Sequence, residues 1–169
     1  MKNIVLIGMP GAGKSTMGVI LAKALRRTFV DADIVIQEHA GRLLQEIIDT
    51  GGPDAFLEIE ENAILSLRCR NAVIATGGSV VFSGRAMEHL KQNGMVIYLK
   101  ISFEAMEKRL KNITTRGIVL HAGESLQGMY NERVPLYERY ADITVDCSEE
   151  DFEDCVANVI AGLKNRKII

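Results

Sequence analysis

Short apolar runs that alternate with amphipathic stretches are the feature that most constrains the fold of this chain. The runs that read as strands occupy residues 4–7, 28–30, 72–75, 95–100 and 143–145. Most of them are apolar on both faces, and the stretches between them carry apolar residues at helical spacing. Strands that are buried on both faces and joined by helices form a parallel sheet covered by helices. The sequence therefore predicts a three-layer α/β/α fold.

Helical stretches fill the intervals between these strands. They are expected at residues 14–26, 32–40, 43–48, 54–70, 83–92, 103–111 and 124–140, with a last helix opened by residues 148–151. Gly51, Gly52 and Pro53 separate two of them, and Pro135 is expected to break or bend another. Residues 112–123 are polar and weakly periodic, so they read as a loop. Without internal repeats, residues 1–169 are expected to form a single domain.

Composition and charge narrow the class of protein. With 47% apolar and 25% charged residues, the chain matches an ordinary globular protein. It shows neither an opening signal peptide nor an apolar run near the ~20 residues that cross a bilayer, so we expect a cytoplasmic protein with no membrane partner. The net charge of −2 argues against a nucleic-acid binder. Residues 1–30 nevertheless hold five Lys or Arg and no acid, which suits a small anionic ligand.

The chain has three cysteines, Cys69, Cys147 and Cys155. Their number is odd, they are widely spaced along the chain, and no C-x-x-C pair occurs. These features predict reduced thiols in or near the core rather than a redox or metal site.

A glycine-rich turn follows the first predicted strand. Residues Gly8 to Ser15 read G-M-P-G-A-G-K-S, which fits the motif G-x-x-x-x-G-K-[ST] between a strand and a helix. Glycines let several backbone N–H groups face one phosphate, and the helix N-terminus adds its dipole. Lys14 can reach the β and γ phosphates, and Ser15 offers a hydroxyl to Mg²⁺. The turn therefore predicts a site for a purine nucleoside triphosphate with Mg²⁺.

A nucleotide site leaves open a switch, a motor or a small-molecule kinase. The N-K-x-D motif with which GTPases read the base is absent. Motor ATPases usually need a longer core than a chain of 169 residues provides. Small kinases are the class that these observations favour.

Two aspartates follow the second predicted strand. Asp31 and Asp33 are two positions apart, so at a strand end their side chains point in opposite directions and can do different work. One carboxylate can stand near Mg²⁺, and the other can accept a proton from an attacking hydroxyl. The alternative is a pair that caps the next helix.

Four segments together resemble the shikimate kinase family, in order and at the family's spacing. They are the glycine-rich turn, Phe29-Val30-Asp31-Ala32-Asp33, Ala75-Thr76-Gly77-Gly78-Ser79, and Glu132-Arg133-x-Pro135-Leu136-Tyr137-x-x-x-Ala141-Asp142. The resemblance covers nearly the whole chain. It implies a P-loop kinase fold of the nucleoside monophosphate kinase type, with a five-stranded parallel sheet in the order 2-3-1-4-5. It further implies a mobile lid at about 112–123, an acceptor-binding region at about 32–62, and a monomer.

The implied reaction transfers the γ-phosphate of ATP to the 3-hydroxyl of shikimate, a small acceptor with a hydroxyl and a carboxylate. The resemblance also assigns roles by position. For the nucleotide and its metal, they fall on Gly11, Ala12, Gly13, Lys14, Ser15 and Thr16, with Asp31 in the metal shell, Arg116 over the phosphates and Arg109 near the adenine. For the acceptor, they fall on Asp33 as the base, on Gly77 and Gly78 as backbone donors, and on Arg133 as partner of the carboxylate. Each arginine has the alternative of an ordinary surface or structural charge.

The chain departs from the family pattern at three places. Leu57 stands where the family motif F-R-x-x-E has an arginine that binds the acceptor carboxylate, and Ser79 replaces the third glycine of G-G-G. The lid sequence R-P-L-L reads Arg-Gly-Ile-Val at residues 116–119. Losing a buried arginine–carboxylate contact costs about 2–5 kcal/mol. The change at residue 57 therefore affects recognition of the acceptor rather than nucleotide chemistry.

Several interpretations of these differences from the family pattern stay open. Another arginine can supply the missing charge, and the candidates are Arg42, Arg85 and Arg139. Alternatively, the acceptor is another hydroxy acid or hydroxy-amino acid, such as gluconate or homoserine, which uses Asp33, Glu58 or Glu60. A third reading is a non-catalytic regulator that binds a nucleotide.

Overall fold

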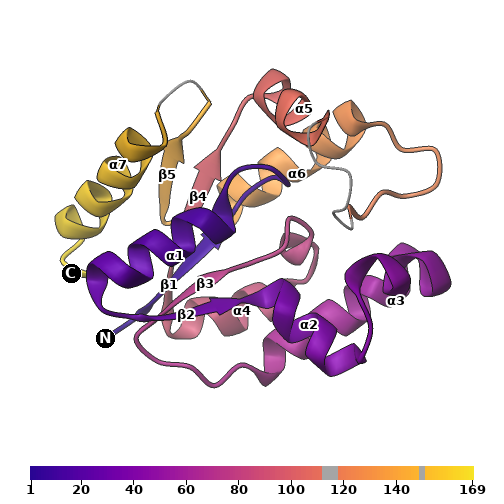
Figure 1. Cartoon of the computed structure of the whole chain (residues 1–169), viewed down its shortest axis with the longest axis horizontal. Coiled ribbons are helices and arrows are strands. Elements are labelled where there is room, and N and C mark those ends of the chain that lie inside the picture. The colour runs from indigo at the N-terminus through magenta and orange to yellow at the C-terminus, as the bar shows by residue number, and fades with distance from the viewer. Residues whose placement is uncertain (112–117, 149–150) are drawn as a thin grey trace.

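A five-stranded parallel sheet forms the centre of the molecule, in a computed structural model that describes residues 1–111, 118–148 and 151–169 (Figure 1). The strands are β1 (Asn3–Ile7), β2 (Thr28–Asp31), β3 (Ala72–Ala75), β4 (Gly94–Lys100) and β5 (Ile143–Asp146). All strand pairs are parallel, and the order is β2-β3-β1-β4-β5. Both the strand positions and the 2-3-1-4-5 order are confirmed. Every predicted strand agrees to within one residue at each end.

Helices cover both faces of the sheet, which confirms the predicted three layers. On one side lie α1 (Lys14–Leu25) and α7 (Phe152–Asn165), and on the other lie α4 (Gly84–Gln92) and α6 (Leu126–Tyr140) (Figure 1). The helix α5 (Phe103–Lys111) packs against α6. The buried strands β1, β3 and β4 supply the middle of the main core, as their apolar sequences predict.

A smaller apolar cluster lies beside the sheet, where α2 (Ala32–Ala40) packs against α3 (Leu44–Ser66). Its buried members are Ile36, Ile47, Phe56, Ala63 and Val119. Because Val119 belongs to the predicted lid at 112–123, this cluster joins the helix pair to the chain that leads into α6. The α2–α3 pair and residues 118–119 therefore pack next to each other.

Two helices differ from expectation. The helices predicted at 43–48 and 54–70 form the single element α3, which contains one non-helical residue, Gly52, with φ 75° and ψ 179°. Glycine adopts this positive φ without the strain that a Cβ would cause. The helix α6 continues through Pro135 to Tyr140, so the proline does not end it. The short 3₁₀ helix η1 (Val80–Phe82) follows β3 and has no counterpart among the predicted elements.

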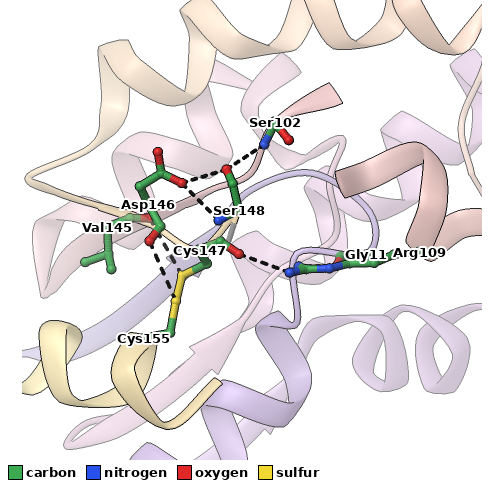
Figure 2. The surroundings of a disulfide bond; sticks show 8 residues. All are labelled: Gly11, Ser102, Arg109, Val145, Asp146, Cys147, Ser148 and Cys155. Carbon is green, nitrogen blue, oxygen red and sulfur yellow. Dashed lines mark hydrogen bonds between the residues drawn. A yellow bond between two sulfur atoms is a disulfide. The ribbon is translucent and has the colours of Figure 1, made fainter. Parts of the chain in front are cut away.

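The prediction for the cysteines is wrong for two of the three. Cys147 and Cys155 form a disulfide across eight positions, with Cα atoms 5.8 Å apart (Figure 2). Cys69 is a free, half-buried thiol. Cys147 directly follows β5, and Cys155 lies in the first turn of α7. The connection between these elements brings the two sulfur atoms together, which spacing along the chain does not reveal.

No helix within the described part of the chain is long and apolar enough to span a membrane.

Candidate active site

The turn between β1 and α1 forms a backbone cradle. Gly8, Gly11 and Gly13 have φ values of 149°, 81° and 87°, which side-chain-bearing residues rarely adopt. A Cβ on Gly8 would also lie 2.6 Å from the carbonyl oxygen of Leu99, so this position has no room for a side chain. Gly13 is the N-cap of α1, so the unpaired N–H groups of the first helical turn adjoin the curled loop. This arrangement suits a phosphate group.

Lys14 folds back over the cradle. Its Nζ donates hydrogen bonds to the carbonyl oxygens of Gly8 at 2.7 Å and Met9 at 2.8 Å, and the residue is buried. The ammonium group therefore lies at the mouth of the loop, where it is available to a phosphate oxygen. This is the location that the motif predicts.

Ser15 and Asp31 form a pair of oxygen donors beside the cradle. The Ser15 hydroxyl donates to Oδ2 of Asp31 at 2.8 Å, and Oδ1 of Asp31 accepts from the backbone N–H of Asp33 at 3.0 Å. Asp31 thus caps α2, as the alternative reading holds, while its second oxygen faces Ser15. Hydroxyl and carboxylate oxygens are the ligands that Mg²⁺ prefers when phosphates complete its shell. The donor set therefore fits magnesium.

A cavity of about 220 Å³ opens next to this pair. It gathers side chains from the carboxyl ends of β1, β2 and β3, as is usual for ligand sites in parallel sheets. Four of the predicted acceptor residues meet here with Lys14 and Ser15, and they are Asp33, Gly77, Gly78 and Arg133. The other lining residues are Pro10, Gln37, Leu43, Leu44, Gln45, Phe56, Glu60, Thr76, Ser79, Ile118 and Val119.

Arg133 is buried at the wall of this cavity, with 2% of its surface exposed. Its Nη2 donates to the carbonyl oxygen of Val119, and its guanidinium lies over the ring of Phe82, 5.3 Å from the centroid. The hydroxyl of Tyr137, one turn along α6, donates to the carbonyl oxygen of Gly78. The contacts with Val119 and Phe82 orient Arg133. The alternative of a surface charge is wrong for this residue.

Glu60, which the sequence analysis names as a contact for an alternative acceptor, is a buried carboxyl group. Its Oε1 accepts a hydrogen bond from the Ser79 hydroxyl at 2.8 Å, and the residue is 2% exposed. Burial raises the pKa of Glu60 to about 7, and the nearby Asp33 acts in the same direction. The Ser79 hydrogen bond and the positive charges of Arg133 and Lys14 lower that pKa, and they offset burial only in part.

The three arginines considered as replacements for the missing charge make other contacts. Arg42 donates to the Thr50 hydroxyl at 3.0 Å, Arg85 pairs with Glu61 at 2.9 Å, and Arg139 lies over the ring of Tyr140. None of them is among the lining residues in the described part of the chain, where Arg133 is the single arginine. Leu57 packs against the smaller apolar cluster, and Glu58 is exposed.

Arg109 connects the phosphate cradle with the end of β5. Its Nη1 donates to the carbonyl oxygen of Gly11 at 3.1 Å and its Nη2 to that of Cys147 at 3.0 Å (Figure 2). Another cavity, of about 390 Å³, lies here beside the cradle. Its lining residues are Gly11, Ala12, Gly13, Thr16, Met17, Arg109, Cys147, Asp151, Phe152 and Cys155.

Residues after β5 form part of this second cavity, and sequence reasoning missed them. Phe152 contributes an aromatic ring that lies 3.5 Å from where a Cβ on Gly13 would be. Asp151 and the disulfide cysteines complete the same wall. The sequence does contain a feature that could have identified them, which is their position directly after the last strand. Loops at the carboxyl ends of parallel strands line the ligand site. Arg116 lies outside the described residues.

Comparison with known proteins agrees with this geometry. The family profile named "Shikimate kinase" matches residues 10–164 of the chain. A shikimate kinase from Caldanaerobacter subterraneus subsp. tengcongensis is 35% identical over 163 residues, which cover 95% of each chain. The chain belongs to the shikimate kinase family. A second member, from Thermodesulfovibrio yellowstonii, is 38% identical over 163 residues, covering 95% of this chain and 94% of the relative.

A solved structure of the shikimate kinase family has the same fold. The shikimate kinase from Acinetobacter baumannii in complex with shikimate superimposes with a TM-score of 0.84 at 30% identity, covering 100% of this chain and 96% of that one. Members of this family are ATP-dependent kinases that phosphorylate a hydroxyl group. The chain is accordingly an ATP-dependent kinase and not the non-catalytic regulator considered above.

Proposed function

We propose that this kinase transfers the γ-phosphate of ATP to the 3-hydroxyl of shikimate. The observation that carries the proposal is one cavity that holds Asp33, Gly77, Gly78 and Arg133 beside Lys14 of the phosphate cradle. Transfer of a phosphoryl group to a small hydroxy acid requires a base, backbone donors, a guanidinium and a phosphate-binding lysine. Family membership and the shikimate complex of the Acinetobacter baumannii relative support the same acceptor.

On the nucleotide side, the backbone N–H groups of residues 11–16 receive the phosphates, and Lys14 turns from its carbonyl partners to the β and γ oxygens. Arg109 borders the cavity beside the cradle, which has the size and the aromatic residue, Phe152, to take the adenine. Ser15 and Asp31 are the residues that would hold Mg²⁺. When bound, this ion neutralises charge on the transferred phosphoryl group.

On the acceptor side, Arg133 pairs with the carboxylate through its planar guanidinium, a geometry that suits two parallel hydrogen bonds. Gly77 and Gly78 allow a close approach, because a Cβ at either position would lie within about 3 Å of Glu60 or Pro10. Asp33 then accepts the proton of the 3-hydroxyl. The hydroxyl oxygen forms a bond to the γ-phosphorus, while the bond from that phosphorus to the bridging oxygen of ADP breaks.

Exclusion of water favours transfer over hydrolysis, and we assign this task to the lid at 112–123. Within it, Ile118 and Val119 line the acceptor cavity, and Val119 accepts the hydrogen bond from Arg133. This contact supports a link between acceptor binding and the lid. We also assign to Arg116 a contact with the phosphates, as the family resemblance implies. The cytoplasmic location and the monomeric state stay predictions.

An assay of ADP release tests the proposed acceptor. The purified chain is incubated with ATP and Mg²⁺ and with shikimate, homoserine, gluconate or no acceptor. We expect release that depends on shikimate and is at background level with the other additions. Release that depends on homoserine or gluconate instead would replace shikimate with that acceptor. Equal release in all four reactions would contradict transfer to any of them.

A further inference from the structure

We propose that Glu60 binds the acceptor as a neutral acid, donating a hydrogen bond from Oε2 to an oxygen of the acceptor while Ser79 holds Oε1. The inference rests on the proposed function and specifies how the same cavity recognises its substrate. It gives Glu60 a direct contact with the acceptor and makes Ser79 a positioning residue. Neither task follows from the phosphate cradle or from Asp33.

The two oxygens of Glu60 have different surroundings. Oε1 accepts the hydrogen bond from Ser79, whereas Oε2 is buried and has no partner among the residues that the structure describes. Oε2 lies 2.9 Å from where a Cβ on Gly77 would be, so it points to the glycine turn that lines the acceptor cavity. A buried polar atom without a partner costs about 1–3 kcal/mol. A ligand that supplies the partner removes this cost.

The charged groups that face Glu60 come from three helices. Asp33 on α2 opposes ionisation, whereas Arg133 on α6 and Lys14 on α1 favour it. Among the described residues, no ion pair joins Glu60 to Arg133, and the Nη2 of Arg133 donates to the carbonyl oxygen of Val119. Lys14 in turn donates to the carbonyl oxygens of Gly8 and Met9. In the described part of the chain, the carboxyl group therefore lacks the direct cationic contact that keeps a buried carboxylate ionised.

A second unpartnered donor borders the same cavity. Nε of Arg133 is buried and has no hydrogen-bond partner within residues 1–111, 118–148 and 151–169. A neutral Glu60 adds an O–H donor, so the cavity offers two buried donors to oxygen atoms of the acceptor. An ionised Glu60 offers none, and it would repel the carboxylate of a hydroxy acid. Binding of the acceptor is therefore coupled to protonation of Glu60.

Calorimetric titration with shikimate, without nucleotide, measures this coupling. Because Glu60 has a pKa of about 7, a site that accepts only its neutral form loses affinity as the pH rises. Kd is then expected to increase about thirtyfold from pH 6 to pH 8.5, since ionisation weakens binding about tenfold per unit above the pKa. Repeating the titration at pH 8 in buffers of different ionisation enthalpy is expected to show uptake of about one proton per shikimate.

Three variants separate the roles of the two residues. Glu60→Gln keeps a donor but cannot ionise, so its Kd is expected to be independent of pH. Ser79→Ala removes the bond that favours the ionised form, so the rise in Kd is expected at higher pH, and Ser79→Thr is expected to restore the original midpoint. Glu61→Gln is the matched control, because Glu61 contacts Ser83 and Arg85 and not the cavity. It should keep the wild-type profile.

Three results would overturn the inference while leaving the proposed function intact. The first is a Kd for shikimate that changes less than twofold between pH 6 and 8.5 without proton uptake. The second is a pH profile of Glu60→Gln that follows that of the wild type. The third is a Ser79→Ala variant that binds shikimate more weakly by the same factor at every pH, as a purely structural role for Ser79 predicts. Absence of shikimate binding at all pH values contradicts the proposed function itself.

Discussion

Asp33 is the residue on which transfer depends most directly. It lines the acceptor cavity, and the hypothetical Cβ of Gly77 lies 3.2 Å from its Oδ1. Asp33→Asn keeps the size of the side chain and removes its basicity. We expect kcat to fall about 10²- to 10⁴-fold, the usual contribution of a general base. The affinity for an ATP analogue, measured by calorimetry, should change less than twofold. A kcat near that of the wild type would rule out this base.

Arg133 has a different task, so its substitution should have a different kinetic signature. Arg133→Lys keeps the charge but loses the planar fork and with it at least one charge-assisted hydrogen bond, worth about 1.5–3 kcal/mol. We expect kcat/KM for the acceptor to fall about ten- to hundredfold, while KM for ATP stays close to that of the wild type. Arg139→Lys, on the exposed side of α6, is the matched control. An equal effect of the two substitutions would contradict the assigned contact.

At the level of elements, the disulfide joins the end of β5 to the first turn of α7 and adjoins the cavity beside the phosphate cradle. Closing a loop of eight positions restricts the unfolded chain, which stabilises the fold by about 2.5 kcal/mol in the loop-entropy estimate. Cys155→Ser should therefore lower the midpoint of urea unfolding under non-reducing conditions. In the presence of a reductant, the wild type and the variant should unfold at the same midpoint.

Thiol titration in denaturant provides the control for that experiment. Of the three cysteines, only Cys69 is free in the structure, so one thiol should react before reduction and three after it. Cys69→Ser should leave none before reduction. Three reactive thiols in the untreated wild type would contradict the disulfide and remove the reason for the expected difference in stability.

The elements also show why the sequence predicted some features and not others. The strands and the phosphate cradle are formed by residues that are adjacent in the sequence. Apolar runs and the Gly8–Ser15 motif therefore suffice to locate them. The strand order came from the family resemblance, because periodicity does not say which strands pair. Ser79 and Glu60, which are 19 positions apart, meet only after α3 packs beside the end of β3. The disulfide likewise depends on a connection whose local sequence has no distinctive pattern.

At the scale of the whole molecule, Glu60 makes stability depend on pH. Its pKa is raised from 4.5 to about 7 in the folded chain by burial, so between these values the folded state binds more protons than the unfolded state. The contribution of Glu60 to the free energy of unfolding is complete below pH 4.5 and is lost as the pH rises through 7. The size of the loss is about 3 kcal/mol, at 1.36 kcal/mol per pKa unit.

Glu60→Gln lacks the ionisable carboxyl group and therefore this pH-dependent contribution to stability. Comparing the variant with the wild type separates the contribution of Glu60 from those of all other titrating groups. The free energy of unfolding, measured with urea at pH 5 and pH 8, should shift in favour of the variant by about 2–3 kcal/mol between the two values. Glu58→Gln, at an exposed position two residues earlier in α3, should show no comparable shift. If the Glu60 variant behaves like the Glu58 variant, the carboxyl group is ionised in the folded chain across this range. The neutral acid required for binding the acceptor would then be absent at neutral pH.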